Sequence, residues 1–192
     1  MRHLGTRVLH TERLTLRPFT VDDAEAMFAG WANDPEVTKY LTWTPHDNIE
    51  VTRALLSLWQ EEAKRPETYN WAIVRRGDAG DELIGNISLL AVDEHHEQAE
   101  LGYCMARKYW GKGIMTEALR EVLRYAFVEV GFYRITGRHA AQNIGSARVQ
   151  EKGGLRYEGT MREAFRLYST GERADIVVRG ILRKDFLVEA RS

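Results

Sequence analysis

Gly111 and Gly113, near the middle of the chain, separate a region with the apolar pattern of strands from a region with the apolar spacing of a helix. This change of pattern restricts the fold more than any other feature. Before these glycines lie three segments with the composition of extended strands, separated by short loops at residues 77–80 and 93–98. Such spacing is typical of consecutive antiparallel strands. After Gly113, apolar residues recur three and four positions apart as far as Phe127, which predicts an amphipathic helix. The three strands are expected at residues 69–75, 82–92 and 99–107.

The segments on either side of this block complete an α/β pattern. Residues 12–17 alternate polar and apolar side chains as a half-buried strand does, and Thr20 followed by Asp23 forms a capping-box pattern before a helix over 21–31. A second helix is expected from residue 47 or 48 to about 65. Its expected apolar face comprises Val51, Leu55, Leu58 and Trp59. Downstream we expect a strand at 133–139, a short helix at 146–152, and two last strands at about 155–162 and 173–182.

The composition fits one globular domain over residues 1–192 and argues against several classes of protein. Lys and Arg number 27 against 28 Asp and Glu, so the basic excess of most nucleic-acid binders is missing and we expect no direct nucleic-acid contact. Cys104 is the only cysteine, which excludes an internal disulfide and a cysteine-rich zinc site. The N-terminus lacks a sustained apolar stretch, and no run approaches the roughly 20 apolar residues of a membrane span. We therefore expect a cytoplasmic protein.

The strand-to-helix junction at residues 108–119, KYWGKGIMTEAL, has the features of an anion site. The first N–H groups of a helix have no internal partner, and the helix dipole adds partial positive charge there. Gly111 and Gly113 allow close approach to the backbone, and Lys108 and Lys112 add charge. The phosphate loop of nucleoside triphosphatases needs four residues between its glycines, and the dinucleotide fingerprint needs a third glycine where Thr116 stands. The pyrophosphate of coenzyme A and a tight turn without a ligand both remain as interpretations.

The junction resembles the signature of the GNAT superfamily of acyl-CoA N-acyltransferases, Gln/Arg-x-x-Gly-x-Gly/Ala, with Lys108 in place of the usual Gln or Arg. ELGYCMARKYWGKGIMTEAL and NIGSARVQEKGGLRYEG resemble the branch of the bacterial ribosomal-protein N-terminal (alanine/serine) acetyltransferases. The opening ERLTLRPFTVDDAEAMF and the closing GERADIVVRGIL also fit that branch, so the resemblance spans nearly the whole chain. It implies an α/β (α+β) fold. The expected sheet is mixed, mostly antiparallel, of about seven strands with the fourth and fifth splayed apart, and has about four helices.

The resemblance also implies where acetyl-CoA binds. Pantetheine would enter between the splayed strands and pair with the edge formed by Tyr103, Cys104, Met105 and Ala106. An isolated cysteine in an apolar strand is usually a small buried side chain, and the family transfers acyl groups directly to an amine, so we expect no covalent intermediate on Cys104. The pyrophosphate would lie on the junction. The residues expected to bind it are Lys108, Trp110, Gly111, Lys112, Gly113, Ile114, Met115 and Thr116.

Asn143 and Ser146 match the family's Asn-x-x-Ser pattern. By resemblance, Asn143 would contact pantetheine and the Ser146 hydroxyl would protonate the departing thiolate, because a thiolate leaves more readily with a proton donor. Serine is also among the preferred N-cap residues, so a structural role as a helix cap is an equal alternative for Ser146. Arg148 and Lys152 lie further along the same helix, where they would meet the cofactor's phosphates or form a solvated charged face.

Direct transfer requires a neutral amine, and Glu100 is the first candidate for the base. It lies two residues before Gly102, where related sequences often carry an acid; Asp93 and Glu94 are weaker candidates, because surface acids are usually solvated. An amino terminus has a reference pKa of about 7.7–8.0 and needs less help than a lysine at about 10.4. His95 and His96 are adjacent, and adjacent strand residues face opposite sides, so we expect no metal site.

The first two helices and their connection are expected to build the acceptor side. Tyr40 and Trp43, in KYLTWTP, and Tyr168, in the loop over 161–170, are the expected substrate-binding residues. The preferred function is transfer of acetyl to a protein amino terminus, with a small amine (an amino acid, polyamine or aminoglycoside) as the alternative acceptor. A non-catalytic acyl-CoA-binding module is the second class of function, and a pure binder need not keep Ser146 or Glu100. Dimers are common in this branch, but no stretch here identifies an interface.

Overall fold

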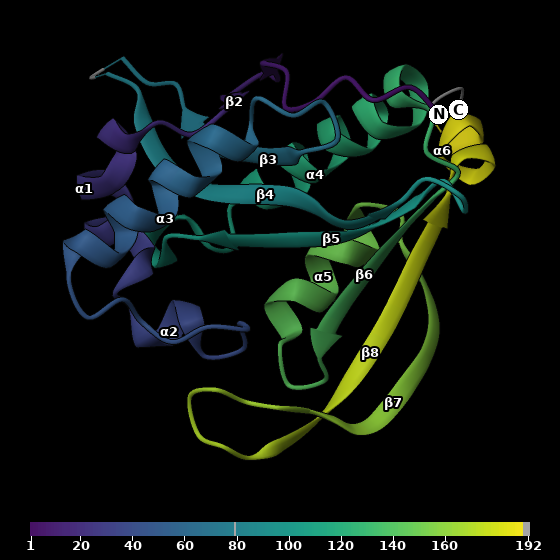
Figure 1. Ribbon diagram of the computed structural model, residues 1–192. Coiled ribbons are helices and arrows are strands. Elements are labelled where there is room, and N and C mark those ends of the chain that lie inside the picture. Colours follow the sequence, from purple (N-terminus) through teal and green to yellow (C-terminus); the bar gives the residue numbers. More distant parts are fainter. Residues whose placement is uncertain (79, 190–192) are drawn as a thin grey trace.

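Eight strands form one sheet in the order β1-β2-β3-β4-β5-β6-β8-β7 (Figure 1). The computed structural model describes residues 1–78 and 80–189. Neighbouring strands are antiparallel except β5 and β6, which run parallel. The strands are β1 Leu9–His10, β2 Leu14–Arg17, β3 Tyr69–Arg75, β4 Glu82–Asp93, β5 Gln98–Met105, β6 Arg134–Ala140, β7 Arg156–Arg166 and β8 Arg173–Leu182.

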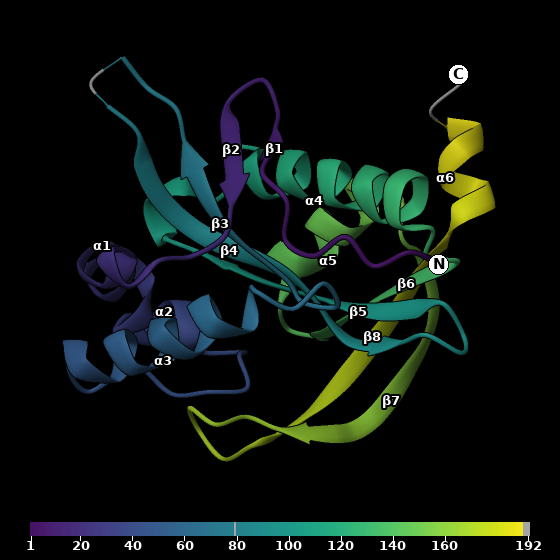
Figure 2. The same ribbon diagram turned by 45° about the horizontal axis from the view of Figure 1, so that its top comes forward.

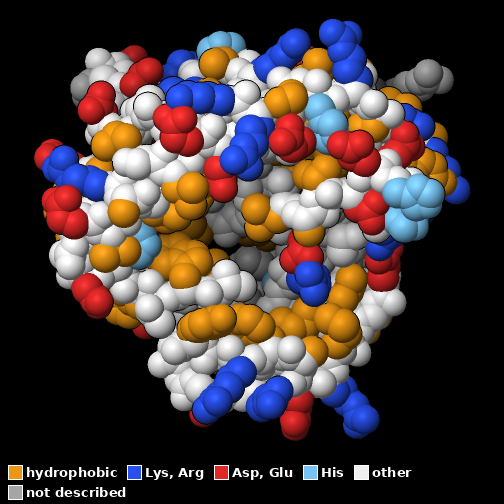
Figure 3. Space-filling view, viewed as in Figure 1, with side chains coloured by type: hydrophobic (Ala, Val, Ile, Leu, Met, Phe, Trp, Pro, Cys, Tyr) orange, Lys and Arg blue, Asp and Glu red, His pale blue; other side chains and the backbone are white. Residues whose placement is uncertain are grey.

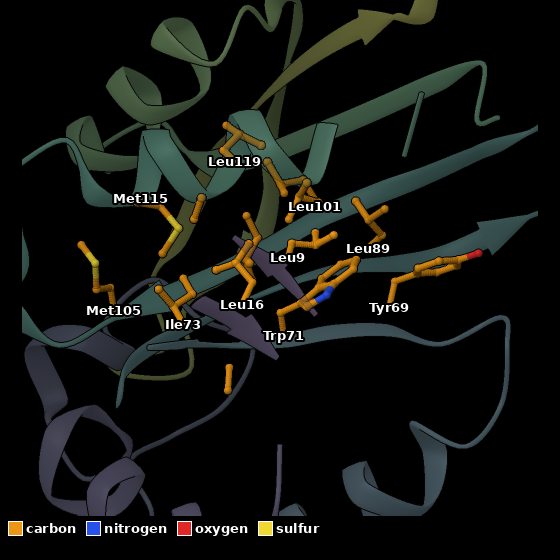
Figure 4. Packing of buried hydrophobic residues seen from close by; sticks show 14 of the residues in the cluster. Leu9, Leu16, Tyr69, Trp71, Ile73, Leu89, Leu101, Met105, Met115 and Leu119 are labelled. Atoms are coloured by element: carbon orange, nitrogen blue, oxygen red, sulfur yellow. The ribbon is translucent and has the colours of Figure 1, made fainter. Parts of the chain in front are cut away.

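The helices lie on both faces of this sheet, α4 and α5 on one and α1 to α3 on the other (Figure 2). Their bounds are α1 Ala24–Met27, α2 Pro35–Thr38, α3 Ile49–Glu62, α4 Ile114–Arg124, α5 Ile144–Lys152 and α6 Arg183–Glu189. Between the sheet and α4, alternate strand residues such as Trp71 and Leu101 pack with Met115 and Leu119 of the helix (Figure 4). This apolar layer fixes the start of α4 against β5.

The strands β5 and β6 separate after four paired positions. Pairing runs only from Gln98 to Leu101 on β5, although β5 continues to Met105 and β6 to Ala140. On its other side β5 stays paired with β4 as far as Met105. One edge of β5 is therefore open beyond Leu101. This confirms the expected splay, because β5 and β6 are the fourth and fifth of the predicted strands, which do not include the short β1.

The predicted strands all form, and the largest differences lie in the first helix. The capping box is present: the Asp23 carboxylate accepts from the Thr20 N–H at 2.8 Å. The helix then begins as a 3₁₀ turn, continues as α1, and widens into a π-helical turn over Phe28–Ala32. The elements β1, α2 and α6 were not predicted. Within residues 1–78 and 80–189, no helix is long and apolar enough to cross a membrane, and the cytoplasmic location stays a prediction.

The apolar face predicted for α3 is half wrong. Leu55 and Trp59 are partly buried as expected, but Val51 and Leu58 are exposed, and Thr52 and Leu56 are fully buried in their place. Thr52 can be buried because its hydroxyl shares a hydrogen bond of 2.7 Å with Nδ1 of His46. The buried face of α3 therefore contains Thr52, a polar residue that a search for apolar spacing does not detect.

Candidate active site

The glycine junction turns the chain through two left-handed residues. Gly111 and Gly113 both have φ of 73°, a conformation that costs other L-residues about 1–2 kcal/mol. A Cβ built on Gly111 would meet no atom within 4 Å, so this side of the loop is open. The helix α4 begins directly after Gly113, which is its N-cap. The loop therefore presents backbone, not side chain, at the start of the helix.

Six consecutive N–H groups, at residues 111–116, donate to no acceptor in the described part of the chain. The groups on either side are used: the Trp110 N–H donates to the Arg107 carbonyl at 3.1 Å, and the Glu117 N–H donates to the Gly113 carbonyl at 3.0 Å. The side chains of Ile114, Met115 and Thr116 are buried. A run of free N–H groups at a helix start binds anions, phosphates above all.

The side chains around the junction are partly committed to other contacts. Lys108 forms an ion pair with Glu82, which raises the pKa of Lys108. The indole N–H of Trp110 donates to the Met105 carbonyl at 2.7 Å. The ammonium of Lys112 lies 5.5 Å from the ring centre of Tyr109 and is exposed. Of the two lysines expected to add charge, only Lys112 has no carboxylate partner among the described residues.

The open edge of β5 exposes the backbone of alternate residues. The Ala106 N–H donates to the Ile84 carbonyl of β4 at 2.8 Å. Because backbone groups alternate between the two sides of a strand, those of Cys104 also face β4, and those of Tyr103 and Met105 face the gap. The Met105 carbonyl is already used by Trp110. Tyr103 therefore offers both backbone groups to a ligand in the gap, and Met105 offers its N–H.

Cys104 is held as a thiol. Its Sγ donates to the side-chain oxygen of Asn86 at 2.9 Å, and burial raises its pKa to about 12. A thiolate is the nucleophilic form of cysteine, and this environment suppresses it. The hydrogen bond and the raised pKa both support the expectation that Cys104 carries no covalent intermediate.

The helix α5 is capped by Asn143, whose side-chain oxygen accepts from the Ser146 N–H at 3.1 Å. The structural alternative for Ser146, that it is the N-cap, is therefore wrong, because Ser146 lies inside the first turn. Its hydroxyl makes no hydrogen bond to any described residue, while its carbonyl accepts from the Tyr103 hydroxyl at 3.2 Å. Arg148 and Lys152 both have exposed side chains.

Glu100 lies on the opposite face of the sheet from α5. It is register-paired with Leu90 of β4 and Thr136 of β6, and its carboxylate forms an ion pair with Arg138 of β6. The pair stands beside the point where the strands separate. Glu100 on one face and Ser146 on the other therefore approach the gap from its two sides.

The two weaker candidates for the base lie at the far end of β5. Asp93 accepts from the N–H and ring of His96 at 2.9 and 2.8 Å, and these hydrogen bonds lower the pKa of Asp93. Glu94 pairs with His3 at 3.0 Å. Within the described residues, no group of three or more His, Cys, Asp or Glu is arranged to hold a metal ion.

The acceptor-side aromatics come from two segments that meet beyond the gap. Tyr40 packs against a small buried cluster of Ala140, Leu167 and Ala174, and the Ser169 hydroxyl donates to the Lys39 carbonyl at 2.9 Å. Tyr168 is exposed, and Trp43 packs against the main core with its ring tilted toward that of His46, the ring centroids 5.2 Å apart. The surface is hollowed between the α1–α3 layer, β5 and the β7–β8 hairpin, and hydrophobic side chains gather along the hairpin (Figure 3).

Sequence reasoning missed Arg138 and Gln150. Gln150 is buried beneath the gap, where its amide nitrogen lies 3.5 Å from the Tyr103 hydroxyl and 3.4 Å from the Arg138 carbonyl. Glu100 and Arg138 are 38 positions apart. No local pattern marks such a contact, and only the register of two parallel strands would have brought these residues together.

Comparison with known proteins gives a family match over most of the chain. The model of the acetyltransferase (GNAT) domain matches residues 13–156. The uncharacterized N-acetyltransferase YoaA of Bacillus subtilis is 33% identical over 92% of this chain and 97% of its own. A solved GNAT acetyltransferase from Bacillus anthracis superposes with a TM-score of 0.79 at 28% identity, covering 93% of this chain and 99% of that one.

Relatives with a named acceptor point in two directions. The putative ribosomal N-acetyltransferase YdaF of Bacillus subtilis is 36% identical over 54% of this chain and 56% of its own. The spermidine N(1)-acetyltransferase of Vibrio cholerae is 26% identical over 73% of this chain and 87% of its own.

Proposed function

The chain belongs to the acetyltransferase (GNAT) family and is an acetyl-CoA-dependent N-acetyltransferase, and we propose that its acceptor is the amino terminus of a protein. The observation that carries the proposal is the Glu100–Arg138 pair at the mouth of the gap. It places a carboxylate that is already hydrogen-bonded to a guanidinium where the acceptor amine would enter.

The cofactor assignment rests on the junction and the open strand edge. The free N–H groups at residues 111–116 fit the pyrophosphate, and the open space at Gly111 leaves room for it. The backbone of Tyr103 and the N–H of Met105 would pair with the pantetheine amides, with Asn143 nearby. The bound cofactor supplies an acetyl thioester at the gap.

The two polar side chains at the gap would divide the proton transfers between them. Glu100, on the acceptor face, would take a proton from the incoming amine nitrogen, directly or through a water. Ser146, on the face of α5, would hold a proton at the departing sulfur with its free hydroxyl. Direct transfer needs a base near the amine and a proton donor near the thioester sulfur. Glu100 and Ser146 fit these two needs, because the amine and the thioester would enter the gap from opposite faces of the sheet.

The Glu100 carboxylate is already engaged by the Arg138 guanidinium, which favours an acceptor that deprotonates readily. At pH 7.5 an amino terminus contains about 200 times more neutral amine than a lysine side chain, given reference pKa values near 8 and 10.4. Two further carboxylates are also paired with arginines, Asp34 with Arg107 at 3.0 Å and Glu158 with Arg134.

An acceptor panel tests this assignment. The panel contains a peptide with a free amino terminus and no lysine, the same peptide N-acetylated with one internal lysine, and spermidine. Release of the coenzyme A thiol and the mass of the product are followed at pH 7.5. We expect the free-terminus peptide to have the highest kcat/KM. Preference for spermidine would instead support the small-amine acceptor, and no turnover with any amine would support a binding module.

A further inference from the structure

The turn between β1 and β2 reaches across to the glycine junction, although about 100 residues separate them. The N–H of Arg13 donates to the Glu117 carboxylate at 2.9 Å, and its side-chain Nε donates to the same carboxylate at 2.6 Å. The Thr11 hydroxyl also donates to Glu117, at 2.5 Å. A second guanidinium nitrogen of Arg13 donates to the Lys112 carbonyl at 3.2 Å. One arginine thus holds both the loop and the first turn of α4.

The contact with the Lys112 carbonyl controls the direction of the next N–H group. The carbonyl of Lys112 and the N–H of Gly113 belong to one planar trans peptide, in which they point in opposite directions. Holding the Lys112 carbonyl toward Arg13 therefore aims the Gly113 N–H away from Arg13. Rotation of this peptide changes ψ of Lys112 and φ of Gly113, and Gly113 is left-handed and conformationally permissive, so without this contact the peptide rotates more easily.

The contact with Glu117 removes an unfavourable charge. Glu117 lies in the first turn of α4, where a carboxylate opposes the binding of another anion. Burial raises the pKa of Glu117, but the hydrogen bonds from Thr11 and Arg13 outweigh it, and the net shift is downward. Glu117 is therefore an anion close to the phosphate-binding backbone, and Arg13 neutralises it.

We propose that Arg13 is a positioning residue for the cofactor's pyrophosphate, which fixes the Lys112–Gly113 peptide and cancels the charge of Glu117. The inference rests on the proposed pyrophosphate site at the junction. It predicts that Arg13 matters only for the part of the cofactor that carries phosphate.

The test compares two acetyl donors, acetyl-CoA and acetyl-pantetheine, which share the thioester and differ in the pyrophosphate and nucleotide. We expect wild-type protein to have a lower KM for acetyl-CoA. Arg13→Ala should raise the KM for acetyl-CoA about tenfold, the usual order for one charged hydrogen bond, and leave kcat and the KM for acetyl-pantetheine nearly unchanged. Arg13→Lys keeps the charge but reaches only one of the two acceptors, so its KM for acetyl-CoA should lie in between.

Arg17→Ala is the matched control, because Arg17 ends β2, the strand that directly follows Arg13, and pairs with Asp23 at 2.7 Å. Any effect of this variant should be equal for both donors. If Arg13→Ala does not fold, Arg13→Met keeps the apolar stem and replaces it. Equal changes for both donors in a folded Arg13 variant overturn the inference. If wild-type protein does not distinguish the donors, the pyrophosphate site itself is overturned.

Discussion

The Tyr103 hydroxyl donates to the backbone carbonyl of Ser146 at 3.2 Å and joins the open edge of β5 to the first turn of α5. Gln150 reinforces the link, because its amide lies between the Tyr103 hydroxyl and the Arg138 carbonyl of β6. Burial raises the pKa of Tyr103, so the hydroxyl stays protonated. Strand β5, which would bind pantetheine, therefore helps to fix the position of Ser146, the proposed proton donor.

Tyr103→Phe removes this link while keeping the ring. We expect a loss of about 1 kcal/mol in the free energy of unfolding, the net value of one hydrogen bond. We also expect kcat to fall about 3- to 30-fold, because a shift of about 1 Å in a reacting group costs up to 100-fold. Tyr133→Phe, at an exposed tyrosine, is the control. Unchanged kcat in a destabilised Tyr103→Phe protein would show that the link serves only the fold.

Substitutions of Ser146 and Asn143 should have different effects, because Ser146 acts on the reaction and Asn143 stabilises helix α5. Asn143 is the cap, so Asn143→Ala should lower the free energy of unfolding by about 0.5–2 kcal/mol. Ser146→Ala removes a hydroxyl without a partner among the described residues, so stability should be unchanged while kcat falls about 100-fold or more. Thermal unfolding and steady-state kinetics on both variants measure this. A folded Ser146→Ala protein with wild-type kcat would contradict the proton-donor role.

Most regular elements could be predicted from the sequence, with β1, α2 and α6 as the exceptions, and the contacts that build the site could not. The apolar spacing of β3 and α4 is strong and local, and Gly113 marks the start of α4 where the structure has it. The buried face of α3 depends on a hydrogen bond between Thr52 and His46. The Glu100–Arg138 pair joins residues 38 positions apart. Such contacts are created by packing and strand register, which no window of sequence contains.

Cys104 should be dispensable and inert. With a pKa of about 12, about one molecule in 10⁴ carries the thiolate at pH 8. A disulfide reagent should therefore label the native protein about 10³-fold more slowly at pH 8 than the protein in denaturant. Cys104→Ala should retain kcat within about twofold, because direct transfer uses no thiol. Rapid labelling of native protein that abolishes activity would contradict the assignment.

His46 should make stability depend on pH. Burial lowers its pKa below the ordinary value of 6.5, so below about pH 6.5 the unfolded state binds more protons than the folded state. The free energy of unfolding should therefore fall as the pH drops through 6.5 toward the lower folded pKa. Chemical denaturation between pH 5 and 8 measures the slope, and His46→Gln should reduce it. His10→Gln is the control, because His10 is exposed; an equal reduction there would contradict the assignment.

Glu100→Gln tests the base through the pH dependence of the reaction. The amide still accepts a hydrogen bond from Arg138 but cannot take a proton. At pH 7, where most of the amino-terminal acceptor is protonated, we expect kcat/KM to fall about 100-fold. Above pH 8 the acceptor loses its proton to solvent, so the deficit should shrink as the pH rises. Glu158→Gln, at the carboxylate paired with Arg134 on the same face, should show no such trend. A deficit that is constant from pH 7 to 9 would mean that Glu100 fixes the strands through Arg138 and that solvent removes the proton.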